Sequence, residues 1–302
     1  YGKYIENPNH FVKDEERYAV LLYFGERYDE SLNLAKSILS KQPNSAQMSR
    51  LLFLNLEKKG DLAGARAAAE DFFKMPGVSF TANDYTTYAN ILNQLEDYDA
   101  EVLAREKAVA ANPAKTELLK DLATAYSQAG GRANRAGDVE AANVYYVKAK
   151  NATASYIDAG TFVTQDLVDL GNRWQNVAAT SPVDSEERQV AITEAIKAID
   201  KVIERVPDNY VPYRNKARMT IVKNGNKPGP ETVAAYTKML ELLNADPENK
   251  TKRVDIYREA YSQIASYHIG QRDAASAKEW YKKMLEIDPD NKALLDYIEK
   301  LK

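Results

Sequence analysis

The segment YSQIASYHIGQRDAASAKEWYKKMLEIDP, residues 261–289, carries two helical patterns separated by a short polar break. Tyr261, Ile264, Ala265 and His268 follow the i, i+3, i+4, i+7 spacing of an amphipathic helix. A second stripe follows at positions 277, 281, 284 and 285, and Pro289 ends it because proline cannot continue a helix. The segment therefore predicts two helices joined by a tight turn.

The order of residue types in this segment resembles the tetratricopeptide repeat (TPR), a helix-turn-helix unit of about 34 residues. It runs aromatic-x2-aliphatic-small-x2-aromatic, then Ala-x3-aromatic, then proline. The segment departs from the family at His268, where Tyr is usual, and at Arg272, where Gly is frequent. The resemblance implies an all-α fold, a right-handed α-solenoid (superhelix) in which each hairpin buries its apolar stripe against its neighbours.

Similar patterns recur along the chain and predict about seven repeats over roughly residues 11–290, in a single array that spans residues 1–302. The predicted repeats cover residues 13–43, 46–76, 83–113, 117–154, 156–207, 210–247 and 255–289. The third repeat is irregular, because its second helix carries Glu101 and Arg105 where an alanine and an aromatic residue are expected.

Both ends of the array carry helical patterns of their own. Residues 291–302 have Leu294, Ile298 and other apolar residues on one face and charged residues on the other, which predicts a capping helix. Residues 1–8 are similar to the end of a second helix and its terminating proline. We therefore expect a truncated repeat that continues upstream of Tyr1.

The fourth, fifth and sixth repeats are longer than the repeat of the family. Their extra residues predict loops at 130–137, 178–190 and 224–231, each between the first and second helix of its repeat. The first helix of the fifth repeat is expected to begin near Tyr156. Three loops on one edge of a regular stack predict a lip beside the groove, and drift in loop length is the alternative interpretation.

Composition excludes several classes of function. The net charge is −3 with both signs interspersed, so the chain lacks the basic stripe of a nucleic-acid-binding protein. No apolar run approaches the roughly 18 residues that a membrane span requires. The chain has no cysteine and two histidines, which excludes disulfides and metal sites built on His and Cys. We therefore expect no cofactor, no metal, no nucleic acid partner and no membrane span.

The sequence also lacks the motifs of common enzymes. It has neither of the glycine-rich phosphate-binding loops, and no serine is paired with a histidine in a recognisable motif. Acidic pairs such as Asp166 and Asp169 resemble the two carboxylates of a glycosidase, so a helical-toroid carbohydrate enzyme is the remote alternative. Because 44 acidic residues supply such pairs by chance, we expect that the protein is not an enzyme.

In the TPR family the first helix of each repeat lines the concave side, so the resemblance implies a groove lined by outward residues of the first helices. These residues are rich in side-chain amides, which donate to and accept from the main chain of an extended peptide. The predicted partner-binding residues are Tyr23, Asn90, Asn93, Gln94, Lys120, Thr124, Gln128, Asn172, Gln175, Arg214, Arg218 and Gln263. The alternative is that they are ordinary solvated residues on exposed helix faces.

Arg214 and Arg218 lie one helical turn apart and are either ordinary surface residues or a pair that holds an acidic side chain or a carboxylate. Another known mode of the family, a two-carboxylate clamp for a peptide C-terminus, needs Lys and Asn where the first repeat has Glu16 and Val20. The sequence therefore does not support that clamp in the first three repeats.

These observations favour a non-enzymatic protein–protein interaction module, a scaffold that holds a peptide or protein partner in its groove. The competing interpretation is a structural or self-assembling segment of a larger envelope protein, in which copies of the chain pair with one another. The lack of cysteine suits an oxidising envelope compartment such as the bacterial periplasm, and a cytoplasmic location stays open. The sequence identifies neither the partner nor the oligomeric state.

Overall fold

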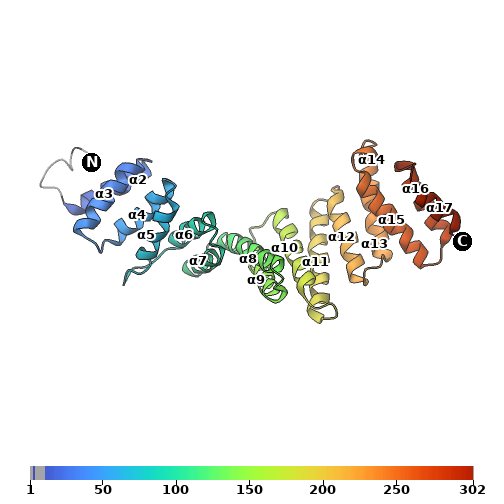
Figure 1. Ribbon diagram of the computed structural model, residues 1–302, viewed down its shortest axis with the longest axis horizontal. Coiled ribbons are helices and arrows are strands. Elements are labelled where there is room, and N and C mark those ends of the chain that lie inside the picture. Colours follow the sequence, from blue (N-terminus) through green and yellow to red (C-terminus); the bar gives the residue numbers. More distant parts are fainter. Residues whose placement is uncertain (1–2, 4–10, 302) are drawn as a thin grey trace. The chain divides into compact units, whose positions relative to one another are not determined.

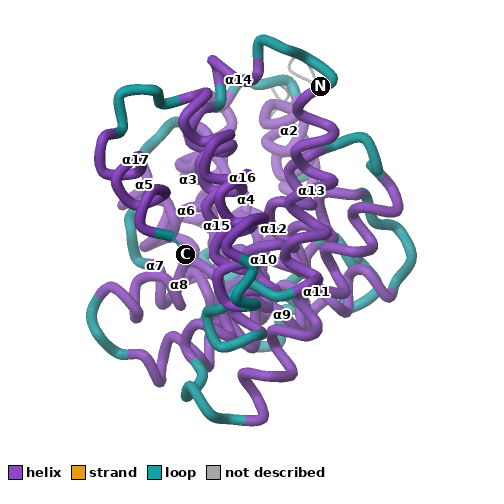
Figure 2. The backbone as a smooth tube through the Cα atoms, turned by 90° about the vertical axis from the view of Figure 1, so that its right-hand side faces the viewer, coloured by secondary structure: helices purple, strands orange, loops and turns teal. Residues whose placement is uncertain are grey.

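The computed structural model describes residue 3 and residues 11–301. These residues form sixteen helices and no strand, which confirms the predicted all-α class. Figure 2, coloured by secondary structure, accordingly contains only helices and loops in the described part of the chain. The truncated repeat expected at residues 1–8 lies outside the described residues, apart from residue 3.

The helices are grouped into two compact units, residues 1–131 and residues 132–302, which we describe separately. Unit 1 consists of three hairpins and the first part of helix α8 (Figure 1). Its helices are α2 (Val12–Phe24), α3 (Tyr28–Lys41), α4 (Ala46–Lys58), α5 (Leu62–Phe72), α6 (Ala82–Gln94), α7 (Tyr98–Ala111) and α8 (Leu118–Arg135). Each helix from α2 to α6 packs against the next one along the chain, and α4 also contacts α2 and α6.

Unit 2 begins at the end of α8 and contains longer hairpins and a short connecting helix (Figure 1). Its helices are α9 (Val139–Asp158), α10 (Thr164–Thr180), α11 (Glu186–Arg205), α12 (Tyr210–Lys223), α13 (Pro230–Asn244), α14 (Asn249–Lys252), α15 (Val254–Gly270), α16 (Ala274–Ile287) and α17 (Lys292–Lys300). Helices that follow one another along the chain again pack together. Helix α15 packs against α13, and α17 packs against α16.

The core of each unit is built from large apolar side chains that interlock with alanines. In unit 1, Phe53 and Phe72 are fully buried with ring centroids 5.5 Å apart. In unit 2, Tyr236, Tyr257 and Ile264 are almost completely buried. Fully burying one such side chain contributes about 1.5–3 kcal/mol, so this packing is the main source of stability.

The amphipathic stripe predicted in residues 261–289 points into this core at most positions. Tyr261, Ile264, Ala265 and Ala277 are buried. His268 is a partial exception, because its side chain is 22% exposed and its Nδ1 lies 3.3 Å from a carboxylate oxygen of Asp273. The histidine therefore lies at the edge of the core, over the turn between the two helices.

A backbone motif recurs at the turn between the first and second helix of a hairpin. One residue takes a left-handed conformation, as at Gly60 (φ 76°) and Glu96 (φ 60°). The next N–H then reaches back to the first helix, as Asp61 N does to Leu56 O at 3.0 Å. This is the Schellman arrangement, which satisfies carbonyls that the end of a helix leaves free. The left-handed position is also taken by Glu26, Gly137 and Arg272.

Aspartates then cap the second helix in four of these turns. Each side chain accepts from the backbone N–H three residues later, at 2.9 to 3.4 Å. The four capping residues are Asp61, Asp97, Asp138 and Asp273. Because the cap also places a negative charge at the positive end of the helix dipole, the left-handed residue followed by Asp fixes where each second helix begins.

The long repeats place most of their extra residues in helices, so the loops predicted at 130–137 and 178–190 are largely wrong, whereas the loop predicted at 224–231 is mostly correct. Residues 130–135 belong to α8, and the loop predicted at 178–190 shrinks to residues 181–185. The loop predicted at 224–231 ends at residue 229, where α13 begins. Helices α8 to α11 have 17 to 20 residues, compared with 13 in α2.

The glycine pair in α8 was the misleading signal. Gly130 is buried inside the helix, and Ala133 packs against the core of unit 2, so tertiary packing overrides the low helix propensity of glycine. Tyr156 is also misplaced by the sequence prediction. It belongs to the last turn of α9, and α10 begins at Thr164.

The turn geometry predicts opposite effects for two exchanges in unit 1. A non-glycine residue in the left-handed region costs about 1–2 kcal/mol. We expect Glu96→Gly to raise the free energy of unfolding by about 0.5–1 kcal/mol and Gly60→Glu to lower it by about 1–2 kcal/mol. A Cβ at Gly60 meets no atom within 4 Å, so the loss there is a backbone effect. Urea unfolding followed by circular dichroism measures both, and shifts in the same direction would contradict this account.

Candidate functional site

The predicted partner-binding residues lie on the first helices of the hairpins, and none of the twelve is buried. They are distributed over α2, α6, α8, α10, α12 and α15. The exposed ones are Asn90, Gln94, Lys120, Thr124, Gln128, Asn172 and Arg218, whereas Tyr23, Asn93, Gln175, Arg214 and Gln263 are half-buried. Exposure alone therefore does not show which of these residues are free to bind a partner. The hydrogen bonds that their side chains form within the chain are more informative.

Two of the amides are held by a charged pair inside unit 1. Asn93 Nδ2 donates to Glu101 Oε2 at 2.8 Å, and Arg105 Nη2 donates to Asn90 Oδ1 at 3.3 Å. Arg105 Nε also donates to Glu101 Oε1 at 2.8 Å, and Glu101 is almost completely buried. The two residues that break the repeat pattern thus form an internal ion pair, and Asn90 and Asn93 complete its hydrogen bonds.

A second group of the predicted residues forms weaker contacts within the chain. Thr124 Oγ1 donates to the backbone carbonyl of Lys120 at 2.9 Å, and Gln94 Nε2 lies 3.4 Å from the carbonyl of Asn90. The Tyr23 ring packs edge-on against Tyr28, with centroids 5.6 Å apart. Burial raises the pKa of Tyr23. These residues remain open to solvent on one side.

A third group has its amides available. Gln128, Asn172, Gln175 and Gln263 form no side-chain hydrogen bond with any other residue that the structure describes. Asn172 and Gln175 lie on α10, and the adjacent Gly171 is buried, so that a Cβ added there would lie 3.6 Å from the Cβ of Ala198 on α11. Of the predicted residues in unit 2, those with open amides therefore lie on α10, with one more on α15.

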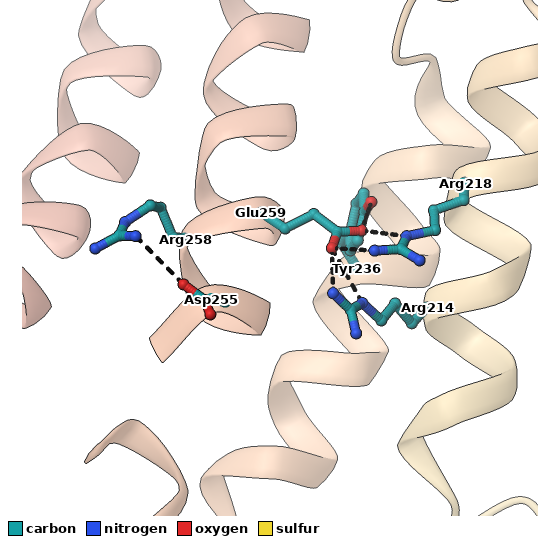
Figure 3. A network of polar contacts seen from close by, with 6 residues as sticks. All are labelled: Arg214, Arg218, Tyr236, Asp255, Arg258 and Glu259. Atoms are coloured by element: carbon teal, nitrogen blue, oxygen red, sulfur yellow. Dashed lines mark hydrogen bonds and ion pairs between the residues drawn. The ribbon is translucent and has the colours of Figure 1, made fainter. Parts of the chain in front are cut away.

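Arg214 and Arg218 already hold a carboxylate of the same chain (Figure 3). Arg214 Nε donates to Glu259 Oε2 at 3.0 Å, and Arg218 Nε donates to Oε1 at 2.7 Å. Tyr236 OH, from α13, donates to Oε1 at 2.8 Å. Arg258, one residue before Glu259, points away and pairs with Asp255 at 3.3 Å. The cluster of Arg214, Arg218, Tyr236 and Glu259 joins α12, α13 and α15.

The cluster strongly favours the charged form of Glu259. Burial raises the pKa of this carboxyl, but hydrogen bonds from Arg218, Arg214 and Tyr236 outweigh burial and hold the pKa at about 2. Burial and the bond to Glu259 raise the pKa of Tyr236. The sequence indicated that the arginine pair could hold an acidic side chain, and the structure supplies Glu259 in that position.

Four cavities in the described part of the chain lie along the second helices, and none of the twelve predicted residues lines them. Three of these cavities open where two successive second helices meet the first helix between them: α5 with α6 and α7, α11 with α12 and α13, and α13 with α15 and α16. Sequence reasoning missed these hollows. The available signal was the small residues Ala100 and Ala104 on the irregular second helix of the third repeat.

The features considered for enzymatic or metal chemistry have structural contacts. Asp166 accepts from the backbone N–H of Val163 at 2.8 Å and so caps α10, and Asp169 accepts from Gln165 at 2.9 Å. Among the described residues, no three His, Cys, Asp or Glu side chains are placed to hold a metal ion. A search of the same residues finds no helix with the length and apolarity of a membrane span.

The depressed pKa of Glu259 predicts a pH-dependent contribution to stability. This contribution is fully present above the unfolded-state pKa, near 4.3, and is lost as the pH falls toward about 2. We expect Glu259→Gln to lower the free energy of unfolding by roughly 2–3 kcal/mol at pH 7 and by progressively less below pH 4.

Urea unfolding between pH 3 and 7 measures this difference. Glu241→Gln is the control, because Glu241 is exposed and pairs only with the exposed Lys238, and it should follow the wild-type profile. A Glu259→Gln deficit that stayed constant over this pH range would contradict the assignment.

Comparisons with known proteins now bear on this arrangement. No protein-family model and no curated protein matches the chain. Among solved structures, the C-terminal part of a TPR repeat-containing protein from Cytophaga hutchinsonii is similar, with a TM-score of 0.54, 20% identity, and coverage of 93% of this chain and 98% of that one.

Two further structures are less similar. A tetratricopeptide repeat protein from Parabacteroides merdae has a TM-score of 0.45 and 10% identity, covering 95% of this chain and 97% of that one. YrrB, described as a TPR protein with an unusual peptide-binding site, has a TM-score of 0.47 and 16% identity, covering 71% of this chain and 96% of that one. Together with the recurring hairpins, the first of the three similarities identifies the fold: the chain is an all-α solenoid of the tetratricopeptide-repeat type.

Proposed function

We propose that the protein is a non-enzymatic scaffold that binds a peptide or protein partner along the outward faces of its first helices. The observation that carries the proposal is the set of amides left without internal partners, Gln128, Asn172, Gln175 and Gln263. An amide group donates and accepts at one position, so it can satisfy both polar groups of a peptide main chain. In unit 2 the proposed contact is centred on α10, where two such residues lie one turn apart.

Arg214 and Arg218 contribute less to the proposed binding surface than the open amides do. Glu259 occupies both guanidinium groups, so a carboxylate of the partner would have to displace it or bind at the outer edge of Arg218, whose side chain is 53% exposed. Reversing the charge of either arginine would remove one donor to Glu259 and place a second carboxylate beside it, and a loss of binding would then be confused with a loss of folding. Binding is better tested through Asn172 and Gln175.

A peptide library supplies the probe, because the partner is unidentified. Random peptides displayed on phage are selected against the full chain, and the dissociation constants of the enriched peptides are measured by fluorescence polarisation. We expect the double variant Asn172→Ala with Gln175→Ala to weaken binding about tenfold, since two neutral hydrogen bonds contribute roughly 1–3 kcal/mol together.

The matched control uses exposed amides on the two second helices that flank α10. Asn151 on α9 and Gln189 on α11 have no side-chain hydrogen bond among the described residues. Their double alanine variant should leave the dissociation constant unchanged. Enriched peptides that respond to the control variant and not to the α10 variant would refute the proposed surface, as would a selection that enriches no peptide.

Self-association is a second candidate function, favoured by exposed apolar residues of α2. Leu21 and Phe24 lie one turn apart and are 50% and 76% exposed. A pair of this kind fits a contact between copies of the chain. Sedimentation of the wild type and of Leu21→Ser with Phe24→Ser distinguishes the two candidates, because a monomer at all concentrations would exclude self-association without affecting the peptide proposal.

A further inference from the structure

Unit 1 contains a cavity of about 320 Å³ on the side of its second helices. Its walls come from α5 and the residues after it, from α6, and from α7. The apolar lining consists of Phe73, Tyr85, Tyr88, Ala100, Leu103 and Ala104, and the polar lining consists of Glu70, Lys74 and Lys107. None of these residues belongs to the surface proposed above.

Stacked aromatic rings form the floor of the cavity. The rings of Phe73 and Tyr85 are parallel within 3°, with centroids 4.7 Å apart, and Tyr88 lies 5.3 Å from Phe73. Phe80 packs edge-on against Phe73 at 5.1 Å and supports the stack from the loop before α6. Rings that hold one another in this way lose little freedom when a ligand binds, so the floor is preorganised.

The cavity stays open because α7 has small residues where it crosses these rings. Ala100 and Ala104 face the cavity, and neither side chain extends beyond its Cβ. The larger Leu103 lies at the rim and is 58% exposed. An exposed leucine beside an aromatic slot provides an apolar edge that a bound side chain would cover.

The charges at the rim are not balanced. Glu70 accepts from Arg66 Nε at 2.9 Å and from Tyr88 OH at 3.2 Å, so its carboxylate is ion-paired within unit 1, and Arg66 also pairs with Asp97 at 2.8 Å. Lys107 Nζ lies 5.9 Å from the centroid of the Tyr85 ring. Lys74 pairs with Asp71 at 3.1 Å, where both side chains are mostly exposed and the bond is weak. Among the described residues that line the cavity, Lys107 is thus the charged side chain without an ion pair.

We propose that this cavity binds one aromatic or large aliphatic side chain of a partner peptide, with an acidic residue next to it in the peptide sequence. Its volume is at the lower end of the range of roughly 300–1,000 Å³ for ligand sites, which fits a single side chain. The side chain stacks on the Phe73 and Tyr85 rings, and the neighbouring carboxylate pairs with Lys107. A buried aromatic anchor beside a charged contact is the arrangement that concentrates binding energy in protein interfaces.

A second cavity, between α13, α15 and α16, differs from the unit 1 cavity in the charge of its lining. It also combines aromatic residues with lysines, and Lys283 Nζ lies 3.9 Å from the Trp280 ring centroid. Glu241 and Glu286 line it as well, so its charge is mixed. The preference for an acidic peptide therefore belongs to the unit 1 cavity.

Three capped pentapeptides test the proposal by fluorescence polarisation with the full chain. The first has a central tryptophan flanked by glutamates, the second has lysines in place of the glutamates, and the third has alanine in place of the tryptophan. We expect the first to bind at least about tenfold more tightly than the other two.

Two variants test whether the first peptide binds in the cavity. Ala100→Leu fills the slot and should abolish binding of the first peptide. Lys107→Glu should weaken the first peptide about tenfold and strengthen the lysine-flanked one, which a general loss of structure cannot do. Lys36→Glu, on the exposed face of α3, is the control and should change neither affinity.

Several results would overturn the proposal. Equal binding of the glutamate and lysine peptides would refute the charge preference, and binding that is insensitive to Lys107→Glu would place the peptide elsewhere. Indole-3-propionate binding as tightly as the first peptide would indicate a small-molecule site. Sedimentation that shows a dimer which Ala100→Leu dissociates would indicate a second copy of the chain as the occupant.

Discussion

The structure depends on the close approach of neighbouring helices through fully buried alanines. Ala19, Ala89, Ala217 and Ala260 on first helices, and Ala35, Ala65, Ala142 and Ala191 on second helices, all have no exposed surface. A larger side chain at such a position would force the helices apart, at a cost of about 1–3 kcal/mol. Because one face of every first helix is committed to this packing, its opposite face is left for polar residues. The scaffold and its candidate binding surface are thus two consequences of the same constraint.

Charged residues within this packing bind helices of the chain to one another. Glu101 and Arg105 use the amides of α6, and Glu259 uses both arginines of α12. Each carboxylate is largely withdrawn from water and is stabilised by several donors, as a buried ion requires. These interactions engage four of the twelve predicted residues in bonds within the chain. The open amides of α10 and α15 are what remains in unit 2.

The repeat pattern predicted the hairpins, because an amphipathic stripe and its terminating proline are local signals that packing reinforces. It failed where packing acts against local signals. The glycine pair in α8 predicted a loop, and the helix continues because its face is buried. Glu101 and Arg105 were identified as departures from the pattern, but their partners Asn93 and Asn90 come from another helix and cannot be inferred from spacing. The cavity over Phe73 was missed for the same reason, since it needs three helices to form.

The proposal that the outward faces of the first helices bind the partner has a direct spatial test. A photoreactive amino acid is placed in the full chain at position 172 or 263, on first helices, and at position 151 or 189, on second helices of the same unit. Each variant is irradiated with a peptide obtained by selection from a random library, and the cross-linked product is measured. The account predicts cross-links from positions 172 and 263 and none from 151 and 189. Cross-links from 151 and 189 alone would contradict it.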